Sequence, residues 1–401
     1  MTLRPLDGVR IISVEQYGAA PFATMYMADM GADVIKIEQP PNSNGRGGDS
    51  SRASGPHFLG PNNSHFFQTF NKSKKSLTLN LKNPDAKEVL HRLVAGADAV
   101  TNNMRGAQVA RNGLNYESLK ACNPAIVCGH LSGYGRKGPR ADWPAYDYLA
   151  QAEAGFMALT GEPDGPPQRM GLSIIDYLGG ITLAFSVTAG IVGALKSGKG
   201  RDIDVTLFDV AMHQLTYPAT WYLNEGDVVE RRPNSGHPSV VPCEVMPTGD
   251  GSIFVMCVLP KFWEAMCNGL GRPDLIEDAR FNTPGLRYQN RDDLMALLNV
   301  EMKTRTTAEW MARLGGKVPL APILSLPDAL ENPFFVESDG IESMDLPQRK
   351  NFRMVASPIR LDGHRATGKP APELGADTDQ ILTELGYSTN QITALRGNGT
   401  I

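Results

Sequence analysis

The opening of the chain alternates between strand-like and helix-like patterns, and this alternation constrains the fold more than any other feature. Residues 9–14 and 33–38 are rich in Val and Ile, as expected of strands. Between them, residues 20–30 predict a helix in which Pro21 is tolerated in the first turn and Gly31 marks the end. Two strands joined through a helix run parallel with a right-handed crossover. The chain is therefore expected to begin as part of an α/β sheet.

The same alternation continues to about residue 207 and then changes. After about residue 226, amphipathic helices outnumber strands, and we interpret this region as a second, smaller domain. A chain of 401 residues is too long for one compact core. Further strands are expected at 76–81, 97–102, 125–131, 202–207, 252–257 and 354–361, and further helices at 84–94, 146–159, 261–270, 292–304, 307–314, 377–385 and 390–395.

Charge and cysteine content narrow the functional classes. A net charge of -4 gives no electrostatic attraction to nucleic acid or to an anionic membrane. The 5 cysteines show no C-x-x-C spacing, so we expect neither a disulfide framework nor a zinc site. No apolar segment follows the first residues, so no signal peptide is expected. These features favour a metal-free protein of the reducing cytoplasm.

The segment from Tyr177 to Leu195 carries no charged residue, and its length matches a membrane-spanning helix. It stands alone within α/β patterning, which is unusual for a membrane protein. We therefore interpret it as a buried helix that packs closely against other backbone. The residues that favour close packing are Gly179, Gly180, Gly190 and Gly193.

The turn after the first strand argues against a dinucleotide site. Glu38 closes the second strand, where an acid that binds ribose would be expected. However, residues 15–21 contain a single glycine, Gly18, and lack the G-x-G-x-x-G pattern that lets pyrophosphate approach the backbone. The unit can still bind a nucleotide-like group at the carboxyl ends of its strands.

Asp176 lies between an apolar run and the uncharged helix, and two interpretations stay open. It can cap the helix, or it can be a functional carboxylate, since desolvating a lone carboxylate is costly without a partner or a role. Asp142 and Asp147 could complete an acid–base set with it. We interpret His130 and His237 as structural, because neither has a second ligand or triad partner at a telling spacing.

Basic residues flank two of the expected strands. They form either a solvated rim or a phosphate site at the strand ends. They are Lys72, Lys74 and Lys75 before the third strand, and Arg105 and Arg111 after the fourth.

Several short motifs, taken in order, resemble the family III CoA-transferases, which include formyl-CoA transferase, carnitine CoA-transferases and α-methylacyl-CoA racemase. The resemblance is strong from about Pro5 to Asp209 and weaker beyond it. The motifs are residues 5–11, 31–38, 73–76, 132–135, 160–167 and 197–200.

The resemblance implies an α/β fold whose Rossmann-like large domain is built from both chain ends. On this basis residues 1–225 form the first part of the large, CoA-binding domain. Residues 226–330 form a small α+β domain, and residues 331–401 return to the large one. The family also implies a homodimer in which the two subunits interlock.

The resemblance further implies a site. The nucleophilic aspartate falls on Asp176, and an assisting acid falls on Asp147. A basic residue common at position 39 is replaced by Gln39, so no ionic contact with the adenosine phosphate is expected there. The glycine-rich flap of formyl-CoA transferase has no equivalent, the nearest stretch being 234–239, so oxalate chemistry is not expected. The positions expected to contact coenzyme A are Tyr17, Gly18, Gln39, Lys74, Lys75, Asn103, Met104 and Arg111.

The residue at position 146 separates two branches of the family. The racemases carry a histidine base there, and this chain has Tyr146, a poor base at neutral pH. The expected activity is therefore CoA transfer from an acyl-CoA, such as succinyl-CoA, to a small carboxylic acid. It would proceed through an aspartyl-CoA thioester, with no metal or tightly bound cofactor. Backbone N–H groups near Gly179 or in 234–236 would stabilise the oxyanions. The alternatives are an acyl-CoA racemase or epimerase and a non-catalytic CoA-binding protein.

Overall fold

A computed structural model describes residues 4–401 and divides them into two compact units. The first comprises the chain up to Ala154 together with Gly171–Gln214 and Phe334–Ile401, and the second comprises Gly155–Met170 and Leu215–Pro333. The sequence prediction set the boundaries at 225/226 and 330/331 and kept residues 155–170 in the large domain. In the structure these residues belong to the second unit.

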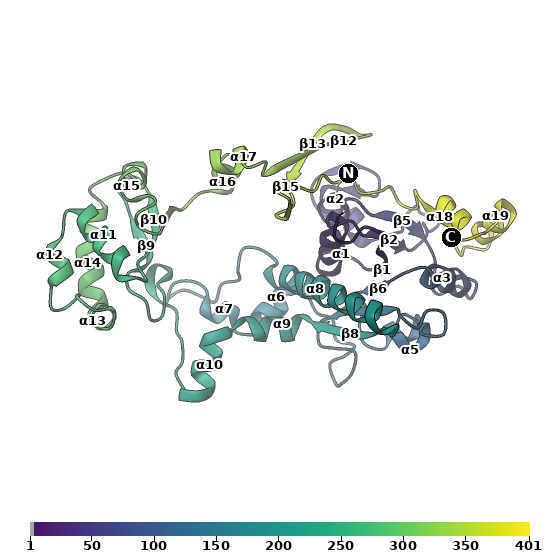
Figure 1. The fold of residues 1–401 in the computed structure, drawn as a ribbon, viewed down its shortest axis with the longest axis horizontal. Helices are drawn as coiled ribbons and strands as arrows, with labels where there is room; N and C mark the ends of the chain where they lie inside the picture. Colours follow the sequence, from purple (N-terminus) through teal and green to yellow (C-terminus); the bar gives the residue numbers. More distant parts are fainter. Residues whose placement is uncertain (1–3) are drawn as a thin grey trace. The chain divides into compact units, whose positions relative to one another are not determined.

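The first unit is built on a six-stranded sheet in the order β5-β2-β1-β6-β7-β8. Every neighbouring pair is parallel, so the expected α/β class with a parallel sheet is confirmed (Figure 1). The strands are β1 (Arg10–Val14), β2 (Asp33–Glu38), β5 (Lys75–Thr78), β6 (Ala99–Asn102), β7 (Val127–Ser132) and β8 (Arg201–Thr206).

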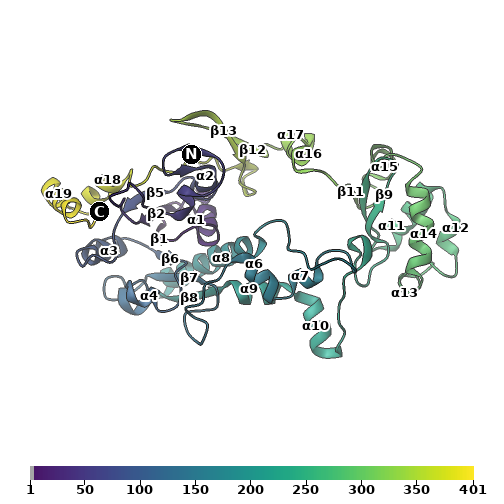
Figure 2. The same ribbon diagram turned by 180° about the vertical axis from the view of Figure 1, so that it is seen from behind.

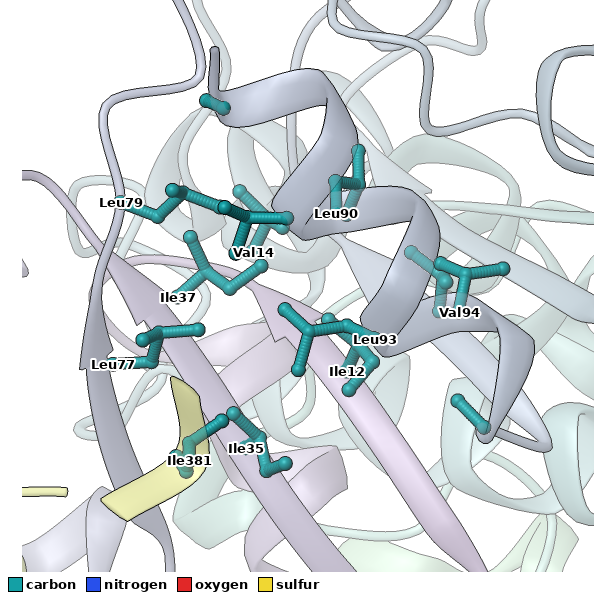
Figure 3. Close-up of a cluster of buried hydrophobic side chains, with 14 of the residues drawn as sticks. Ile12, Val14, Ile35, Ile37, Leu77, Leu79, Leu90, Leu93, Val94 and Ile381 are labelled. Atoms are coloured by element: carbon teal, nitrogen blue, oxygen red, sulfur yellow. The ribbon is translucent and has the colours of Figure 1, made fainter. Parts of the chain in front are cut away.

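One face of the sheet carries a large apolar core. Alternate strand residues such as Ile12 and Ile35 point to this face, because side chains along a strand alternate between its two sides. They pack against Leu90 and Leu93 of α3 (Ala86–Ala95), as Figure 3 shows. This core contributes stability, and its members Val14, Ile37 and Leu79 reach the carboxyl ends of the strands.

The C-terminal helices complete this core. In both views α18 (Thr378–Glu384) and α19 (Thr389–Gly397) lie beside β5 and α3 (Figures 1 and 2). Ile381 joins the cluster formed by the strands (Figure 3), and the backbone N–H of Asn80 donates to the carbonyl of Thr400 at 2.7 Å. Residues from both ends of the chain therefore build one unit.

The other face of the sheet is covered by α1 (Ala19–Asp29) and α8 (Ile174–Ser197). A Cβ atom on Gly180 would lie 2.6 Å from the carbonyl oxygen of Ala19, and one on Gly190 would lie 2.7 Å from Ile203. A Cβ on Gly129 of β7 would lie 2.5 Å from Val187 of α8. Glycine is thus required at these positions for α8 to approach α1 and the sheet.

The prediction that this helix is buried holds for one face only. Among the described residues, α8 is the one helix long and apolar enough to cross a membrane, and 33% of its most apolar window is buried. Its opposite face is exposed in the single chain and forms an apolar stripe. The large side chains of this stripe are Ile181, Phe185, Val192 and Leu195.

The helix expected over 146–159 is broken in two. Its parts are α6 (Asp147–Glu153) and α7 (Phe156–Leu159). Gly155 separates them with φ 85°, a left-handed conformation that glycine adopts without steric cost. The break coincides with the boundary between the two units.

The remaining elements of the first unit surround the sheet or form short hairpins. They are η1 (Ser50–Ala53), β3 (Phe58–Gly60), β4 (Asn63–Ser64), α2 (His65–Asn71), α4 (Gln108–Arg111), α5 (Tyr116–Leu119), α9 (Leu207–Gln214), β12 (Ile341–Leu346), β13 (Arg349–Val355), β14 (Arg360–Leu361) and β15 (His364–Arg365), while α17 (Pro333–Glu337) begins at the unit boundary.

The second unit has its own core beneath a small antiparallel sheet in the order β11-β10-β9. Trp263 and Trp310 are among its fully enclosed side chains. Its elements are α10 (Thr216–Glu225), η2 (Pro233–Ser235), β9 (Cys243–Pro247), β10 (Ser252–Met256), α11 (Pro260–Leu270), α12 (Asp274–Glu277), α13 (Pro284–Gln289), α14 (Arg291–Met302), α15 (Thr307–Leu314), β11 (Leu320–Pro322) and α16 (Leu326–Leu330), with α7.

Candidate active site

A cavity of about 1400 Å³ lies within the first unit at the carboxyl ends of its strands. Val14, Glu38 and Ser132, which end β1, β2 and β7, all line it. Ligands of open parallel sheets bind at this edge, where the strand-to-helix loops gather. The volume is large enough for a nucleotide-sized ligand.

Asp176 lines this cavity as the third residue of α8. A Cβ atom on Gly18 would lie 3.2 Å from its Oδ2, so the carboxylate faces the backbone where α1 begins. Burial, and then the negative charge of Asp147, raise the pKa of Asp176 to about 7. A free aspartate is fully ionised at neutral pH, whereas this carboxyl is close to half protonated there.

Asp147, and not Asp176, caps α8. Its Oδ2 accepts hydrogen bonds from the backbone N–H groups of Ile175 at 2.6 Å and of Asp176 at 3.0 Å. Its Oδ1 accepts a bond from Nε2 of Gln151 at 2.6 Å. Asp147 is 3% exposed. A carboxylate from another helix therefore satisfies N–H groups that would otherwise lack partners, and it fixes the backbone that carries Asp176. Asp142, the third candidate acid, lies against Gly106 and does not line the cavity.

The turn between β1 and α1 has an unusual conformation. Tyr17 has φ 68°, which residues other than glycine rarely adopt. The next residue, Gly18, precedes α1, and its carbonyl accepts the helix bond from Phe22 at 2.9 Å. The first N–H groups of a helix have no partner within it, and Pro21 has no N–H at all. The N–H groups of Ala19 and Ala20 are therefore available at the end of α1 that faces Asp176.

The structure brings most of the predicted CoA contacts into this cavity. Gln39 follows β2, Asn103 and Met104 follow β6, and Arg111 ends α4. Tyr17 and Gly18 belong to the turn before α1. All six residues line the cavity together with Asp176.

Lys74 does not reach the cavity, contrary to the prediction. Its Nζ donates hydrogen bonds to Oε1 of Glu15 at 2.9 Å, to the carbonyl of Pro21 at 2.9 Å and to Oδ1 of Asn71 at 3.1 Å. The side chain is fully buried, and burial lowers the pKa of Lys74 to about 8. Lys74 is thus part of the interior of the unit.

Lys75 lies at the opposite edge of the sheet. It begins β5, and its Nζ pairs with Asp33 at the start of β2 at 2.7 Å. Parallel strands place their amino ends together, so this edge faces away from the carboxyl-end cavity. Neither Lys74 nor Lys75 is therefore placed to contact a ligand in the cavity.

Other polar residues also line the cavity; Arg105 was among the basic residues considered as a phosphate site, whereas Lys82, Gln108 and Asn112 were not predicted. Lys82 follows β5, and Arg105 lies between β6 and α4. Gln108 begins α4, and Asn112 follows its last residue. Lys82 could have been found from sequence, because it follows an expected strand, whereas Lys74 and Lys75 precede that strand. Together with Arg111, these side chains give the cavity three cations.

Gly179, one of the two expected sources of oxyanion donors, is not placed to donate, whereas a donor role for residues 234–236 stays a prediction. Gly179 is the sixth residue of α8, beyond the first turn with its free N–H groups, and a Cβ there would lie 3.2 Å from Leu207. Residues 234–236 belong to the second unit. The start of α1, which Asp176 faces at Gly18, also belongs to the first unit.

The two single histidines have structural partners. His130 is buried between Asn102 and Asp202, each 2.9 Å from one of its ring nitrogens. The Nδ1 of His237 accepts bonds from the N–H groups of Ser239 and Val240 at 3.1 Å. Within residues 4–401 no group of three His, Cys, Asp or Glu residues could hold a metal ion.

Comparison with known sequences decides the family. The sequence model described as CoA-transferase family III matches residues 6–378. The chain belongs to this family. The resemblance found in the sequence motifs is thereby confirmed, and this CoA-transferase is an enzyme that moves coenzyme A from an acyl-CoA to a carboxylic acid.

Relatives of this CoA-transferase cover nearly its full length. It is 33% identical to the succinate–glutarate CoA-transferase of Agrobacterium fabrum, over 95% of this chain and 96% of that protein. It is 31% identical to the succinyl-CoA:mesaconate CoA-transferase of Haloarcula marismortui, over 96% of this chain and 97% of the other. Among solved structures, a CaiB/BaiF family protein from Brucella suis matches with a TM-score of 0.80 and 31% identity, covering 96% of this chain and all of that one.

Proposed function

We propose that this enzyme transfers coenzyme A from succinyl-CoA to a small dicarboxylic acid through a covalent aspartyl-CoA thioester on Asp176. The observation that carries the proposal is the carboxyl of Asp176, which lines a large cavity at the strand ends, faces the start of a helix and has a pKa raised to about 7 by burial. The donor and the acceptor class are inferred from the names of the relatives, which act on succinate, glutarate or mesaconate.

The reaction proceeds by four exchanges at carbonyl carbons. An oxygen of Asp176 attacks the thioester carbon, the C–S bond breaks, and a mixed anhydride and CoA thiolate form. The thiolate attacks Cγ of Asp176 and releases the donor acid, which leaves aspartyl-CoA. The acceptor carboxylate then attacks Cγ and displaces the thiolate, and the thiolate attacks the acceptor carbonyl, which restores Asp176. Each step is nucleophilic substitution, and charge is balanced throughout.

The start of α1 supports stabilisation of the oxyanions formed on the way. The N–H groups of Ala19 and Ala20 have no partner in their own helix, and the helix dipole favours negative charge at this end. Donors that are fixed before the reaction need no reorganisation when charge develops.

Asp147 acts in this scheme as a positioning residue. Both of its oxygens accept hydrogen bonds, two of them from the backbone at Ile175 and Asp176. Its charge also contributes to the raised pKa of Asp176. A proton-transfer role for Asp147 is less well supported by this geometry than a role in holding the nucleophile.

The cations of the cavity support binding of the phosphates of coenzyme A. Lys82, Arg105 and Arg111 line it, and they compensate for the absence of a basic residue at Gln39. Lysine and arginine are the side chains that proteins use to bind phosphate. The thioester is a substrate, and no tightly bound cofactor takes part.

We further propose that the enzyme is an interlocked homodimer in the cytoplasm. The exposed apolar stripe on α8 supports burial against a second copy, because monomers rarely leave such a surface uncovered. All five cysteines are free thiols, in keeping with a reducing compartment.

Intact mass spectrometry after incubation with succinyl-CoA tests the covalent step. We expect the protein to gain the mass of coenzyme A less one water, and peptide mapping to locate the adduct on Asp176. The Asp176→Ala variant should gain no mass and should lose transfer by at least about a hundredfold. A variant that keeps the adduct or the activity would exclude Asp176 as the nucleophile.

A further inference from the structure

The turn that faces Asp176 is held by side chains from two other parts of the first unit. Asn103 binds the backbone of Gln16 twice: the Gln16 N–H donates to Oδ1 at 2.9 Å, and Nδ2 donates to the Gln16 carbonyl at 2.7 Å. The N–H of Tyr17 donates to Oδ1 of Asp49 at 3.0 Å. These bonds clamp the two residues that precede Gly18.

The clamp opposes a conformational cost. Tyr17 has φ 68°, and the left-handed region is sterically unfavourable for residues other than glycine. Such a conformation persists only when surrounding groups impose it. Without the bonds from Asn103 and Asp49, Tyr17 would be expected to relax to negative φ and to move Gly18.

Asp49 is itself fixed by a buried ion pair. It is 2% exposed, its Oδ2 lies 2.9 Å from Nζ of Lys36, and its Oδ1 also accepts a bond from the N–H of Ser51 at 2.8 Å. The same Nζ of Lys36 donates to the carbonyl of Glu15 at 2.9 Å. The Nζ of Lys36 therefore contacts both Glu15, at the start of the turn, and Asp49, which binds Tyr17 in the middle of the turn.

The clamped turn determines where backbone meets the reacting carboxylate. A Cβ on Gly18 would be 3.2 Å from Oδ2 of Asp176, so a small shift of the turn changes the environment of this oxygen directly. Misplacement of a catalytic group by about 1 Å can lower a rate by about a hundredfold. The position of the turn is thus a condition for the chemistry.

We infer that Asn103 and Asp49 are positioning residues for the transfer reaction, and that they act by holding residues 15–18 so that the start of α1 lies against Asp176. The inference rests on the proposed role of Asp176. It also gives Asn103 a different role from the direct CoA contact that the family resemblance implies. Both side-chain atoms of its amide are already bonded to Gln16.

The test measures the rate at which the protein gains coenzyme A from succinyl-CoA, by rapid quench and intact mass, over a range of concentrations. Asn103→Ala is expected to lower the maximal rate by about 10–100-fold and to change the half-saturating concentration by less than about threefold, since only reactivity is affected. Asp49→Ala should behave alike. Asp49→Asn keeps an oxygen for the Tyr17 N–H but loses the ion pair with Lys36, so its maximal rate should lie between those of the wild type and of Asp49→Ala.

Asn123→Ala is the matched control. Its amide donates to the carbonyls of Val94 and Ala97 at 3.1 and 2.7 Å and accepts from Ala125, far from the turn in the sequence and outside the lining of the cavity. It should lower the melting temperature and leave the maximal rate unchanged. If Asp49→Ala does not fold, the half-buried Asn103 still decides the question.

The outcomes separate the two claims. A raised half-saturating concentration with an unchanged maximal rate in Asn103→Ala would make Asn103 a ligand contact and overturn the inference. If Asn103→Ala reacts at the wild-type rate and Asp176→Ala forms no adduct, the inference about the turn is overturned and the proposed function stands. An adduct that persists in Asp176→Ala would overturn the proposed function and this inference with it.

Discussion

At the scale of single residues, Asp176 combines two opposing requirements. A nucleophilic carboxylate must be ionised, yet burial and the neighbouring charge of Asp147 favour its protonated form and raise its pKa to about 7. The same desolvation makes the ionised form more reactive, because water no longer stabilises it. Burial therefore makes the ionised form of Asp176 more reactive and lowers the fraction of enzyme in which Asp176 is ionised.

This balance predicts the pH dependence of the reaction. Only the deprotonated Asp176 attacks, so kcat/KM should rise with pH through an apparent pKa of about 7 and level off above pH 8. A profile measured from pH 5.5 to 9 with a stable thioester substrate checks this. A rate already at its plateau at pH 5.5 would show that the carboxyl ionises with an ordinary pKa.

A second prediction at this scale concerns the cations of the cavity. Arg111→Ala and Lys82→Ala should each raise the KM for acyl-CoA by about tenfold and alter kcat less, because phosphate contacts far from the thioester act equally on substrate and transition state. Lys75→Ala should leave KM unchanged, since Lys75 pairs with Asp33 at the other edge of the sheet. Steady-state kinetics of the three variants, with melting temperatures, decide the matter; a raised KM in Lys75→Ala alone would favour the family resemblance over this geometry.

At the scale of elements, the glycines of α8 have opposite roles. Gly180 lies against the backbone of α1, where a Cβ would come 2.6 Å from the Ala19 carbonyl. Gly193 lies in the same helix with nothing within 4 Å of such a Cβ. The first glycine sets the approach of two helices that both border the site, and the second only weakens its own helix.

Paired alanine substitutions should therefore change stability in opposite directions. Gly180→Ala should lower the free energy of unfolding by about 1–3 kcal/mol, because overpacking forces the helices apart, and it should also reduce activity. Gly193→Ala should raise it by about 0.5–1 kcal/mol through helix propensity. Chemical denaturation of both variants measures the difference; equal effects would contradict the packing assigned to Gly180.

The elements also show how far sequence reasoning reaches. Strands β1, β2 and β6 and helices α1, α3 and α15 were predicted to within about two residues, because their apolar periodicity and end signals are local. Asp176 and most cavity residues were found by their place after strands or by family motifs. The capping of α8 by Asp147 was not found, since the partner lies 28 and 29 positions away. Lys74 was misplaced because its partner, Glu15, is 59 positions away.

At the scale of the whole molecule, the proposed interlocked dimer makes a kinetic prediction. Subunits that thread each other cannot separate without unfolding, so tagged and untagged preparations mixed under native conditions should form no hybrid dimers over days. Hybrids should appear after joint unfolding and refolding. Native mass spectrometry detects them, and rapid exchange of folded subunits would exclude interlocking. A monomer in light scattering would exclude the dimer.

The packing of α18 against β5 also affects how the chain can fold while it is being synthesised. The hydroxyl of Thr378 accepts the backbone N–H of Thr78 at 3.0 Å across 300 positions. At about 5–20 residues per second, roughly 15–60 s pass between synthesis of the strand and of its cover. Because β5 is also an edge strand, the nascent chain presents an unpaired strand edge and bare apolar side chains such as Leu77 and Ile35 throughout that interval. We therefore expect chaperones to bind the nascent chain during translation, because the last helices pack beside one of the first strands.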